Sequence, residues 1–129
     1  PIGSKTYTVK IPDEIMNAGE EYIFATIRGI FDTDGCVFLD KRKIYLKPYP
    51  RITLQIVSKP LFMQLKEFLE NHFPLYTHHN EKRESYTIEV YGFKQVEKWM
   101  KLIGFSNKRH LSKIQSLGLS NEIFKASPS

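Results

Sequence analysis

Apolar residues in the first third of the chain recur at intervals of three and four, which is the period of an amphipathic helix. This apolar stripe consists of Ile23, Ile27, Ile30 and Phe31. It predicts a helix over residues 20–34. A shorter helix is expected just before it, opened by Pro12 and Asp13.

The pattern then changes to strict alternation, which is typical of strands that bury one face. Strands are expected over residues 36–46 and 51–58, joined by a turn at residues 47–50. The apolar positions of the first strand change parity midway, so we expect a bulge or twist in residues 40–43.

A helix and a hairpin are then repeated. Pro60 opens a helix whose apolar face continues to Phe73, and a hairpin of residues 75–79 and 85–91 follows, joined by a charged turn at residues 80–84.

The chain ends in two further helices. We expect one over residues 93–103, ended by Gly104, and a short basic one over residues 107–117.

The expected order αββαββα defines an α+β fold with helices on one face of an antiparallel sheet. We expect a single domain over residues 1–129, with an N-terminal extension at residues 1–10 and a frayed tail at residues 126–129. The other face of the sheet carries Lys, Arg, Gln, Thr and Tyr, which no core accounts for. A solvated face would explain either hairpin alone, but two such hairpins in a basic protein favour a nucleic-acid groove.

A stripe of small residues runs along the first long helix. Ala25, Gly29 and Thr33 lie four residues apart, and a glycine inside a helix costs about 1 kcal/mol relative to alanine. Close packing of a second helix would compensate. That helix could come from the same chain, as an ordinary core contact, or from another subunit.

Composition excludes several classes of protein. The single cysteine, Cys36, rules out an internal disulfide and a cysteine-rich zinc site. No apolar run approaches the roughly 20 residues that cross a bilayer, and the start lacks the features of a signal peptide. We expect a soluble protein in a prokaryotic cytoplasm, without a membrane or small-molecule cofactor.

Charge is distributed unevenly. Residues 1–35 hold three basic and six acidic side chains, whereas residues 36–129 hold 16 basic and 8 acidic ones. An acidic helix therefore precedes a basic body, which would attract a polyanion. The sequence pI of about 9.3 is explained equally well by solubility alone.

Residues 27–35 read Ile-Arg-Gly-Ile-Phe-Asp-Thr-Asp-Gly, so the apolar helix ends in two carboxylates and a glycine. Asp32 and Asp34 at a helix end can hold a hard cation through carboxylate oxygens. Gly35 would let the backbone turn sharply.

This segment resembles the signature of the LAGLIDADG homing endonuclease family, in its single-motif archaeal and intein-like branch. Each position matches in residue type except Arg28, where the family's name has alanine. Residues 11–15, 58–61 and 103–107 also resemble that branch, so the resemblance covers about residues 10–115.

The family implies a saddle of strands that lies in the DNA major groove, with signature helices from two units packed at its centre. Since this chain has one signature, the resemblance implies a homodimer. Its expected interface residues are Ala25, Gly29, Asp32 and Thr33. Two-fold symmetry predicts a palindromic or nearly palindromic double-stranded DNA target.

The resemblance also implies a metal site. Asp34 would hold Mg²⁺ with help from the backbone carbonyl of Thr33, and Mn²⁺ or Ca²⁺ can substitute for binding. Asp32 would cap the partner helix by accepting backbone N–H bonds. The ions would activate water and stabilise charge on the phosphate, and each subunit would cut one strand.

Three residues are expected to support catalysis by Asp34. The family places a polar residue after the second strand, which falls at Ser58 and Lys59. It places a lysine at the end of the fourth strand, where this chain has Gly92, with Lys94 two residues on. The missing lysine leaves open whether cleavage is retained.

Contacts to DNA are expected from both hairpins and the last helix. The first hairpin would supply Lys41, Lys43, Tyr45, Arg51, Thr53 and Gln55. The second would supply Thr77, His79, Arg83, Thr87 and Glu89. Backbone contacts are expected from Lys108, Arg109 and Lys113. Arginine and lysine would favour guanine, and glutamine adenine.

The leading hypothesis is an intron-encoded, homodimeric, Mg²⁺-dependent nuclease that hydrolyses both strands of a specific DNA site. The main alternative keeps the fold without cleavage, as a DNA-binding protein or an intron RNA maturase. A third possibility is half of a larger two-repeat enzyme or intein.

Overall fold

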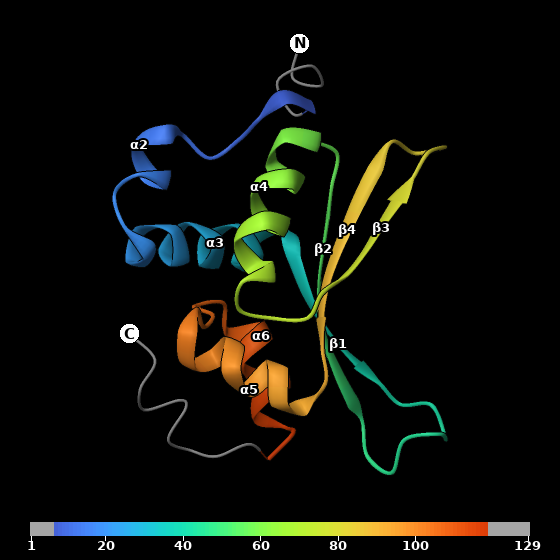
Figure 1. Ribbon diagram of the computed structural model, residues 1–129. Coiled ribbons are helices and arrows are strands. Elements are labelled where there is room, and N and C mark those ends of the chain that lie inside the picture. Colours follow the sequence, from blue (N-terminus) through green and yellow to red (C-terminus); the bar gives the residue numbers. More distant parts are fainter. Residues whose placement is uncertain (1–6, 119–129) are drawn as a thin grey trace.

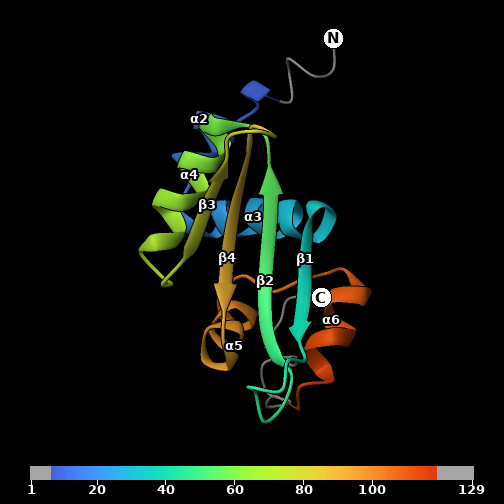
Figure 2. The same cartoon turned by 90° about the vertical axis from the view of Figure 1, so that its right-hand side faces the viewer.

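The computed structural model describes residues 7–118, so the expected tail and residues 1–6 of the N-terminal extension lie outside the described residues. Helices cover one side of a single sheet, and the other side is open (Figures 1 and 2). The described elements are α2 (Asp13–Met16), α3 (Glu20–Asp34), β1 (Gly35–Asp40), β2 (Tyr49–Ile56), α4 (Lys59–Glu70), β3 (Tyr76–Asn80), β4 (Ser85–Tyr91), α5 (Phe93–Leu102) and α6 (Lys108–Gln115).

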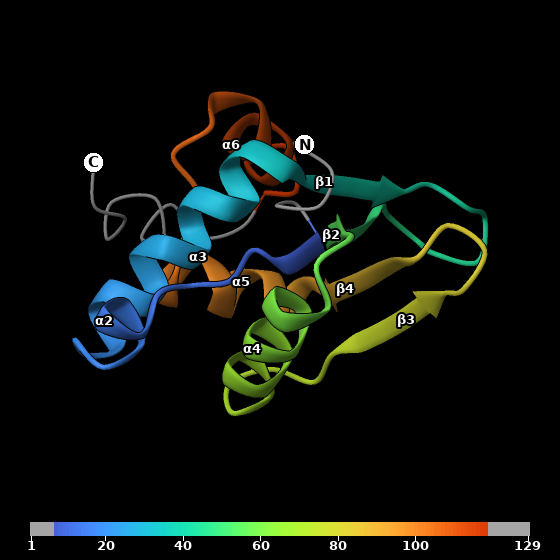
Figure 3. The ribbon, with the colours of Figure 1, turned by 90° about the horizontal axis from the view of Figure 1, so that it is seen from above.

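The sheet has four antiparallel strands in the order β1-β2-β4-β3. The two hairpins therefore meet through β2 and β4, and the shorter strands form the edges (Figure 2). Seen from above, the helices and the sheet form two layers, and β1 continues directly from the end of α3 (Figure 3). The predicted α+β fold class is confirmed.

The core lies between the helices and the covered face of the sheet. Phe31 of α3, Leu54 of β2, Ile88 of β4 and Trp99 of α5 are all fully buried. The Phe31 and Trp99 rings lie 4.7 Å apart, which joins the signature helix to α5. Burial of these large side chains is the main source of stability and fixes the position of α3 against the sheet.

One predicted strand is wrong. β1 ends at Asp40 instead of continuing to residue 46, and β2 begins at Tyr49, inside the predicted turn. The Asp40 side chain accepts hydrogen bonds from the backbone N–H and the side chain of Arg42, which turns the chain out of the sheet.

The apolar residues beyond that turn do not reach the core. Ile44 and Leu46 are 76% and 109% exposed in the β1–β2 loop, so the second parity of this segment reflects a loop rather than a bulged strand.

Candidate nucleic-acid interface

Asp34 is the last residue of α3, and its side chain is exposed. The chain passes straight into β1 through Gly35, whose φ of −84° is available to any residue. Crowding rather than a sharp turn requires glycine there, because a Cβ would lie 2.7 Å from the Phe31 carbonyl oxygen. The terminal carboxylate of the helix therefore lies at the rim of the sheet. The position that follows it, residue 35, has no room for a side chain.

Asp34 borders a hollow of about 380 Å³ at this rim. The hollow is also lined by Gln55 of β2, by Val9 of the N-terminal segment and by Ser58. Gln55 donates to the Ser85 hydroxyl at 3.1 Å, which holds its amide on the sheet. The predicted DNA contact Gln55 thus lines the same hollow as the signature carboxylate.

The expected supporting residues do not gather around Asp34. Ser58 lines the same hollow but is only 1% exposed and caps α4, accepting from the Leu61 N–H at 3.2 Å and donating to the Val9 carbonyl. Lys59 borders a separate hollow beside the β3–β4 turn. Lys94 borders a third hollow on α5 with His72. The geometry of the described chain therefore leaves Asp34 without a neighbouring lysine from this predicted set.

Asp32 has a partner that the sequence did not reveal. Its Oδ1 accepts the backbone N–H groups of Ser106 and Asn107, both at 2.9 Å, and Asn107 Nδ2 donates to the Asp32 carbonyl at 2.8 Å. The expected capping chemistry is present at the start of the chain's own α6. This contact was not foreseen because α6 is remote from Asp32 in the sequence, and the expected cap on a partner helix stays a prediction.

Arg28 occupies the signature position that departs from alanine. Its Nε donates to the Ile103 carbonyl at 2.7 Å, at the end of α5. Arg28 and Asp32 thus hold both ends of the connection between α5 and α6, which ties the signature helix to the last part of the described chain.

The small-residue stripe is uncovered. Ala25, Gly29 and Thr33 are exposed, and a Cβ built on Gly29 would meet nothing within 4 Å. The Thr33 hydroxyl donates to the Gly29 carbonyl of the same helix at 3.0 Å. Among residues 7–118, the alternative that this stripe packs inside the chain is therefore wrong.

The strand register decides which side chains face outward. Thr53 pairs with Glu89, and Gln55 with Thr87, whereas Leu54 pairs with the buried Ile88. Directly paired residues share a face, so the polar set lies on the open side, as expected from the alternation.

Two predicted contacts on β3 lie on the opposite face. Thr77 pairs with Ile88 and His79 with Tyr86, and the His79 ring stacks on Tyr86 at 4.5 Å. Their placement on the open face was wrong, because β3 is a short edge strand without clear alternation and only its pairing with β4 sets its parity. Tyr76 and His78 occupy the open face instead.

Most of the predicted cations remain available to solvent. Lys41 and Lys43 are exposed in the β1–β2 loop, Arg83 in the β3–β4 turn, and Lys108 and Arg109 at the start of α6. Lys113 is also exposed, but its Nζ donates to the Val37 carbonyl at 3.1 Å and so anchors α6 to the edge strand β1.

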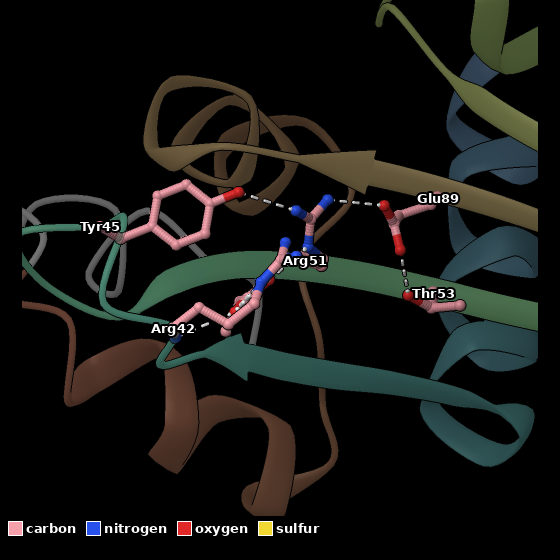
Figure 4. Close-up of polar contacts among 6 residues, drawn as sticks. Arg42, Tyr45, Arg51, Thr53 and Glu89 are labelled. Atoms are coloured by element: carbon pink, nitrogen blue, oxygen red, sulfur yellow. Dashed lines mark hydrogen bonds and ion pairs between the residues drawn. The ribbon is translucent and has the colours of Figure 1, made fainter.

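A polar network lies across the two central strands (Figure 4). Arg51 Nη1 contacts Glu89 Oε2 at 3.0 Å, Arg51 Nη2 donates to the Tyr45 hydroxyl at 3.1 Å, and Thr53 donates to Glu89 Oε1 at 3.1 Å. Asp40, 5% exposed, lies 3.5 Å from Arg51 Nε. This network positions four of the predicted DNA contacts, Tyr45, Arg51, Thr53 and Glu89, before any DNA is present.

Electrostatics keep Asp40 and Arg51 ionised. Hydrogen bonds from the Arg42 side chain hold the pKa of Asp40 below its usual range, with the charge of Arg51 acting in the same direction. Burial lowers the pKa of Arg51, but the hydrogen bond and charge of Glu89 outweigh it and raise the pKa above its usual range. Both groups are therefore charged at neutral pH.

Within the described range, no group of three or more His, Cys, Asp or Glu side chains could hold a metal ion. Among the described residues that line the hollow beside Asp34, Asp34 supplies the one carboxylate. No helix among residues 7–118 is long and apolar enough to cross a membrane.

The family follows from this arrangement and from comparison with known proteins. A family model described as a LAGLIDADG-like domain matches residues 21–104, which include all of α3 after its first residue, the whole sheet and α5. The chain belongs to the LAGLIDADG family. A search of curated protein sequences gave no match.

Two solved homing endonucleases are similar in structure. I-CvuI, crystallised with the I-CreI target and 2 mM Mg with the DNA not cleaved, has a TM-score of 0.56 at 16% identity, covering 81% of this chain and 74% of that one. I-TnaI has a TM-score of 0.49 at 12% identity, covering 84% of this chain and 82% of that one. At this identity, the likeness to I-CvuI supports the fold.

Proposed function

We propose that this protein is a homodimeric, divalent-metal-dependent endonuclease that cuts both strands of a specific double-stranded DNA site. One observation carries the proposal. The signature helix ends in an exposed Asp34 at the rim of the open sheet, and the stripe beside it at Gly29 is uncovered.

The dimer follows from what one protomer lacks. A glycine in an exposed helix position costs stability and gains nothing within the protomer, but it allows two helices to approach closely. Two copies packed through this stripe would place two Asp34 carboxylates near the symmetry axis. The charge repulsion between them would be relieved by cations. Residues 7–118 of one protomer hold no group of three or more metal-binding side chains, so a second copy would complete the site.

The residues at the rim fit a hard divalent cation. Asp34 would hold Mg²⁺ with the Thr33 carbonyl, since carboxylate and carbonyl oxygens are the ligands that Mg²⁺ prefers. When bound, the metal supplies activation of water and stabilisation of charge on the phosphate. Gln55, in the same hollow, would orient the phosphate or water through its amide.

The open face would lie in the major groove. Its central polar set is Arg51, Thr53, Gln55, Thr87 and Glu89. The exposed cations of the β1–β2 loop and of α6 would contact the phosphate backbone on either side. A two-fold symmetric dimer would read two half-sites of a palindromic or nearly palindromic target.

A binding-only function is the second candidate, and a specific observation favours it. The Ser58 hydroxyl already caps α4 by accepting from the Leu61 N–H, and Lys94 lies in a hollow separate from that of Asp34. A chain without these supporting groups could bind DNA or intron RNA and not cut it.

Purified protein separates these candidates. Its mass in solution is measured first by sedimentation, and a randomised duplex library is then selected for cleavage with Mg²⁺ or Mn²⁺. We expect a dimer, a two-fold symmetric consensus, and loss of cutting without loss of binding in Asp34→Asn. Asp13→Asn, an exposed carboxylate on α2, is the matched control and should cut normally.

Three results would contradict the endonuclease proposal in different ways. Unimpaired cutting by Asp34→Asn would remove the assigned metal ligand. Specific binding with no cleavage by the wild type in either metal would leave the binding-only function. A monomeric mass would favour half of a larger two-repeat protein.

A further inference from the structure

Arg51 and Glu89 form an ion pair on the open face that is held in place from both sides. Their side chains are 20% and 16% exposed, and Nη1 and Oε2 lie 3.0 Å apart. Thr53 fixes the second carboxylate oxygen, and Tyr45 fixes the second terminal nitrogen of the guanidinium (Figure 4). The pair is therefore a rigid unit on the central strands.

The unit keeps unused hydrogen-bonding capacity. Each terminal nitrogen of an arginine carries two N–H groups, and each carboxylate oxygen accepts more than one hydrogen bond. The contacts within the network use one N–H on Nη1 and one on Nη2. Arg51 therefore keeps free N–H donors next to free acceptor positions on Glu89. These free groups lie on Nη1 and Oε2, the two atoms that join the pair at 3.0 Å.

This unit borders a hollow of about 310 Å³ on the open face. The other lining residues are Leu75, Tyr76 and Tyr91. These three residues are uncharged, so the Arg51–Glu89 pair supplies the charged groups of the hollow.

A DNA phosphate is a poor ligand for this place. Glu89 would repel a phosphate anion, and it already neutralises Arg51 at 3.0 Å. Base edges differ, because they offer amino donors to a carboxylate as well as acceptors to a guanidinium. The pair is therefore suited to read bases, whereas the exposed lysines of the β1–β2 loop suit the backbone.

The spacing of the pair matches one edge of a base pair. In the major groove, guanine O6 accepts and cytosine N4 donates. These two atoms are hydrogen-bonded to each other, so they lie about 2.9 Å apart. Arg51 and Glu89 present the complementary donor and acceptor at 3.0 Å.

The orientation of the Arg51–Glu89 pair on the base pair follows from the fact that Arg51 carries the donors and Glu89 the acceptors. Arg51 must face the base with the keto oxygen, and Glu89 the base with the amino group. A T·A pair has the same order of groups, but the thymine methyl lies where guanine N7 would accept the second arginine N–H. Guanine is therefore favoured opposite Arg51.

We propose that the Arg51–Glu89 pair reads a single G·C base pair in each half-site, with guanine at Arg51 and cytosine at Glu89. This inference rests on the proposed DNA-binding function of the open face. It makes Glu89 a specificity-determining residue that reads cytosine, and not merely a support for Arg51.

The test is a binding selection on randomised duplex DNA, with Ca²⁺ in place of Mg²⁺ and salt held constant. It compares the wild type with Glu89→Met, which keeps the length of the side chain and removes the acceptors, and with Glu89→Gln, which keeps one acceptor. Glu14→Gln on α2 is the control for the loss of a negative charge from an exposed position.

We expect the wild type to prefer G·C over C·G by about tenfold or more in each half-site, at one symmetric pair of positions. Glu89→Met should lose that preference at those positions alone, Glu89→Gln should lose part of it, and Glu14→Gln should keep it. Thermal unfolding checks that each variant folds, and if Glu89→Met does not, the partial loss in Glu89→Gln decides.

Several outcomes would overturn the inference. They are the absence of a G·C preference in the wild type, an unchanged preference in a folded Glu89 variant, and an equal loss of affinity for every sequence. A wild type that binds single-stranded RNA and not duplex DNA would instead refute the proposed function itself. Measuring wild-type duplex binding first keeps these failures distinct.

Discussion

The two signature carboxylates are predicted to have separable roles, although they lie only two residues apart. Asp32 accepts two backbone N–H groups at the start of α6, whereas Asp34 is exposed at the rim. Removing the Asp32 carboxylate should therefore destabilise the fold. Removing the Asp34 charge should leave stability unchanged and abolish cleavage.

The size of the effect at Asp32 follows from its contacts. Loss of a helix cap costs about 0.5–2 kcal/mol, and a hydrogen bond to a charged group contributes about 1.5–3 kcal/mol. Ser106 is exposed and Asn107 half-buried, so water replaces part of what is lost. We expect Asp32→Ala to lower the free energy of unfolding by about 2 kcal/mol, which at about 4 °C per kcal/mol lowers Tm by about 8 °C.

Asp34→Asn should change the free energy of unfolding by less than about 0.5 kcal/mol, as for an ordinary surface substitution. Asp32→Asn keeps an acceptor oxygen and should fall between the two. Urea and thermal unfolding, measured without metal at one protein concentration, give these values, and cleavage with Mg²⁺ gives the catalytic effect. Equal destabilisation by Asp34→Asn and Asp32→Ala, or wild-type stability of Asp32→Ala, would refute the reasoning.

Three further predictions concern the glycines and the acidic end of β1. Gly29→Ala should stabilise the isolated protomer by up to about 1 kcal/mol and weaken the dimer in sedimentation, because its Cβ meets nothing within the chain. Gly35→Ala should lower the free energy of unfolding by about 1–3 kcal/mol in urea, since its Cβ would lie 2.7 Å from the Phe31 carbonyl oxygen. Because the pKa of Asp40 is lowered in the fold, its contribution should persist above about pH 4 and disappear as the pH falls further, so that wild type and Asp40→Asn converge in acid. A Gly29→Ala dimer as strong as wild type, a neutral Gly35→Ala, or a stability difference at Asp40 that survives in acid would each contradict its prediction.

The helices were predictable because their signals are local. The predicted helix over residues 20–34 coincides with α3, since the apolar spacing lies within the helix and the glycine that ends it follows directly. The same holds for β4, where the predicted residues 85–91 match the observed strand. The end of β1 was missed because it depends on the Asp40 side chain accepting hydrogen bonds from Arg42, which the hydrophobic pattern does not reveal.

The sequence by itself determined the α+β class, the signature carboxylates, the stripe of small residues and the polar alternation of the central strands. These depend on residue types at fixed spacing, which act over one or two turns of helix or one strand. Only the tertiary structure decided that Asp32 accepts hydrogen bonds at the start of α6 and that Arg51 forms an ion pair with Glu89. It also decided that Thr77 and His79 lie on the face of the sheet that the helices cover, and that Ser58, Lys59 and Lys94 border different hollows. Each of those facts joins segments that are remote in the chain, and strand register and helix packing set such contacts through the burial of the whole core.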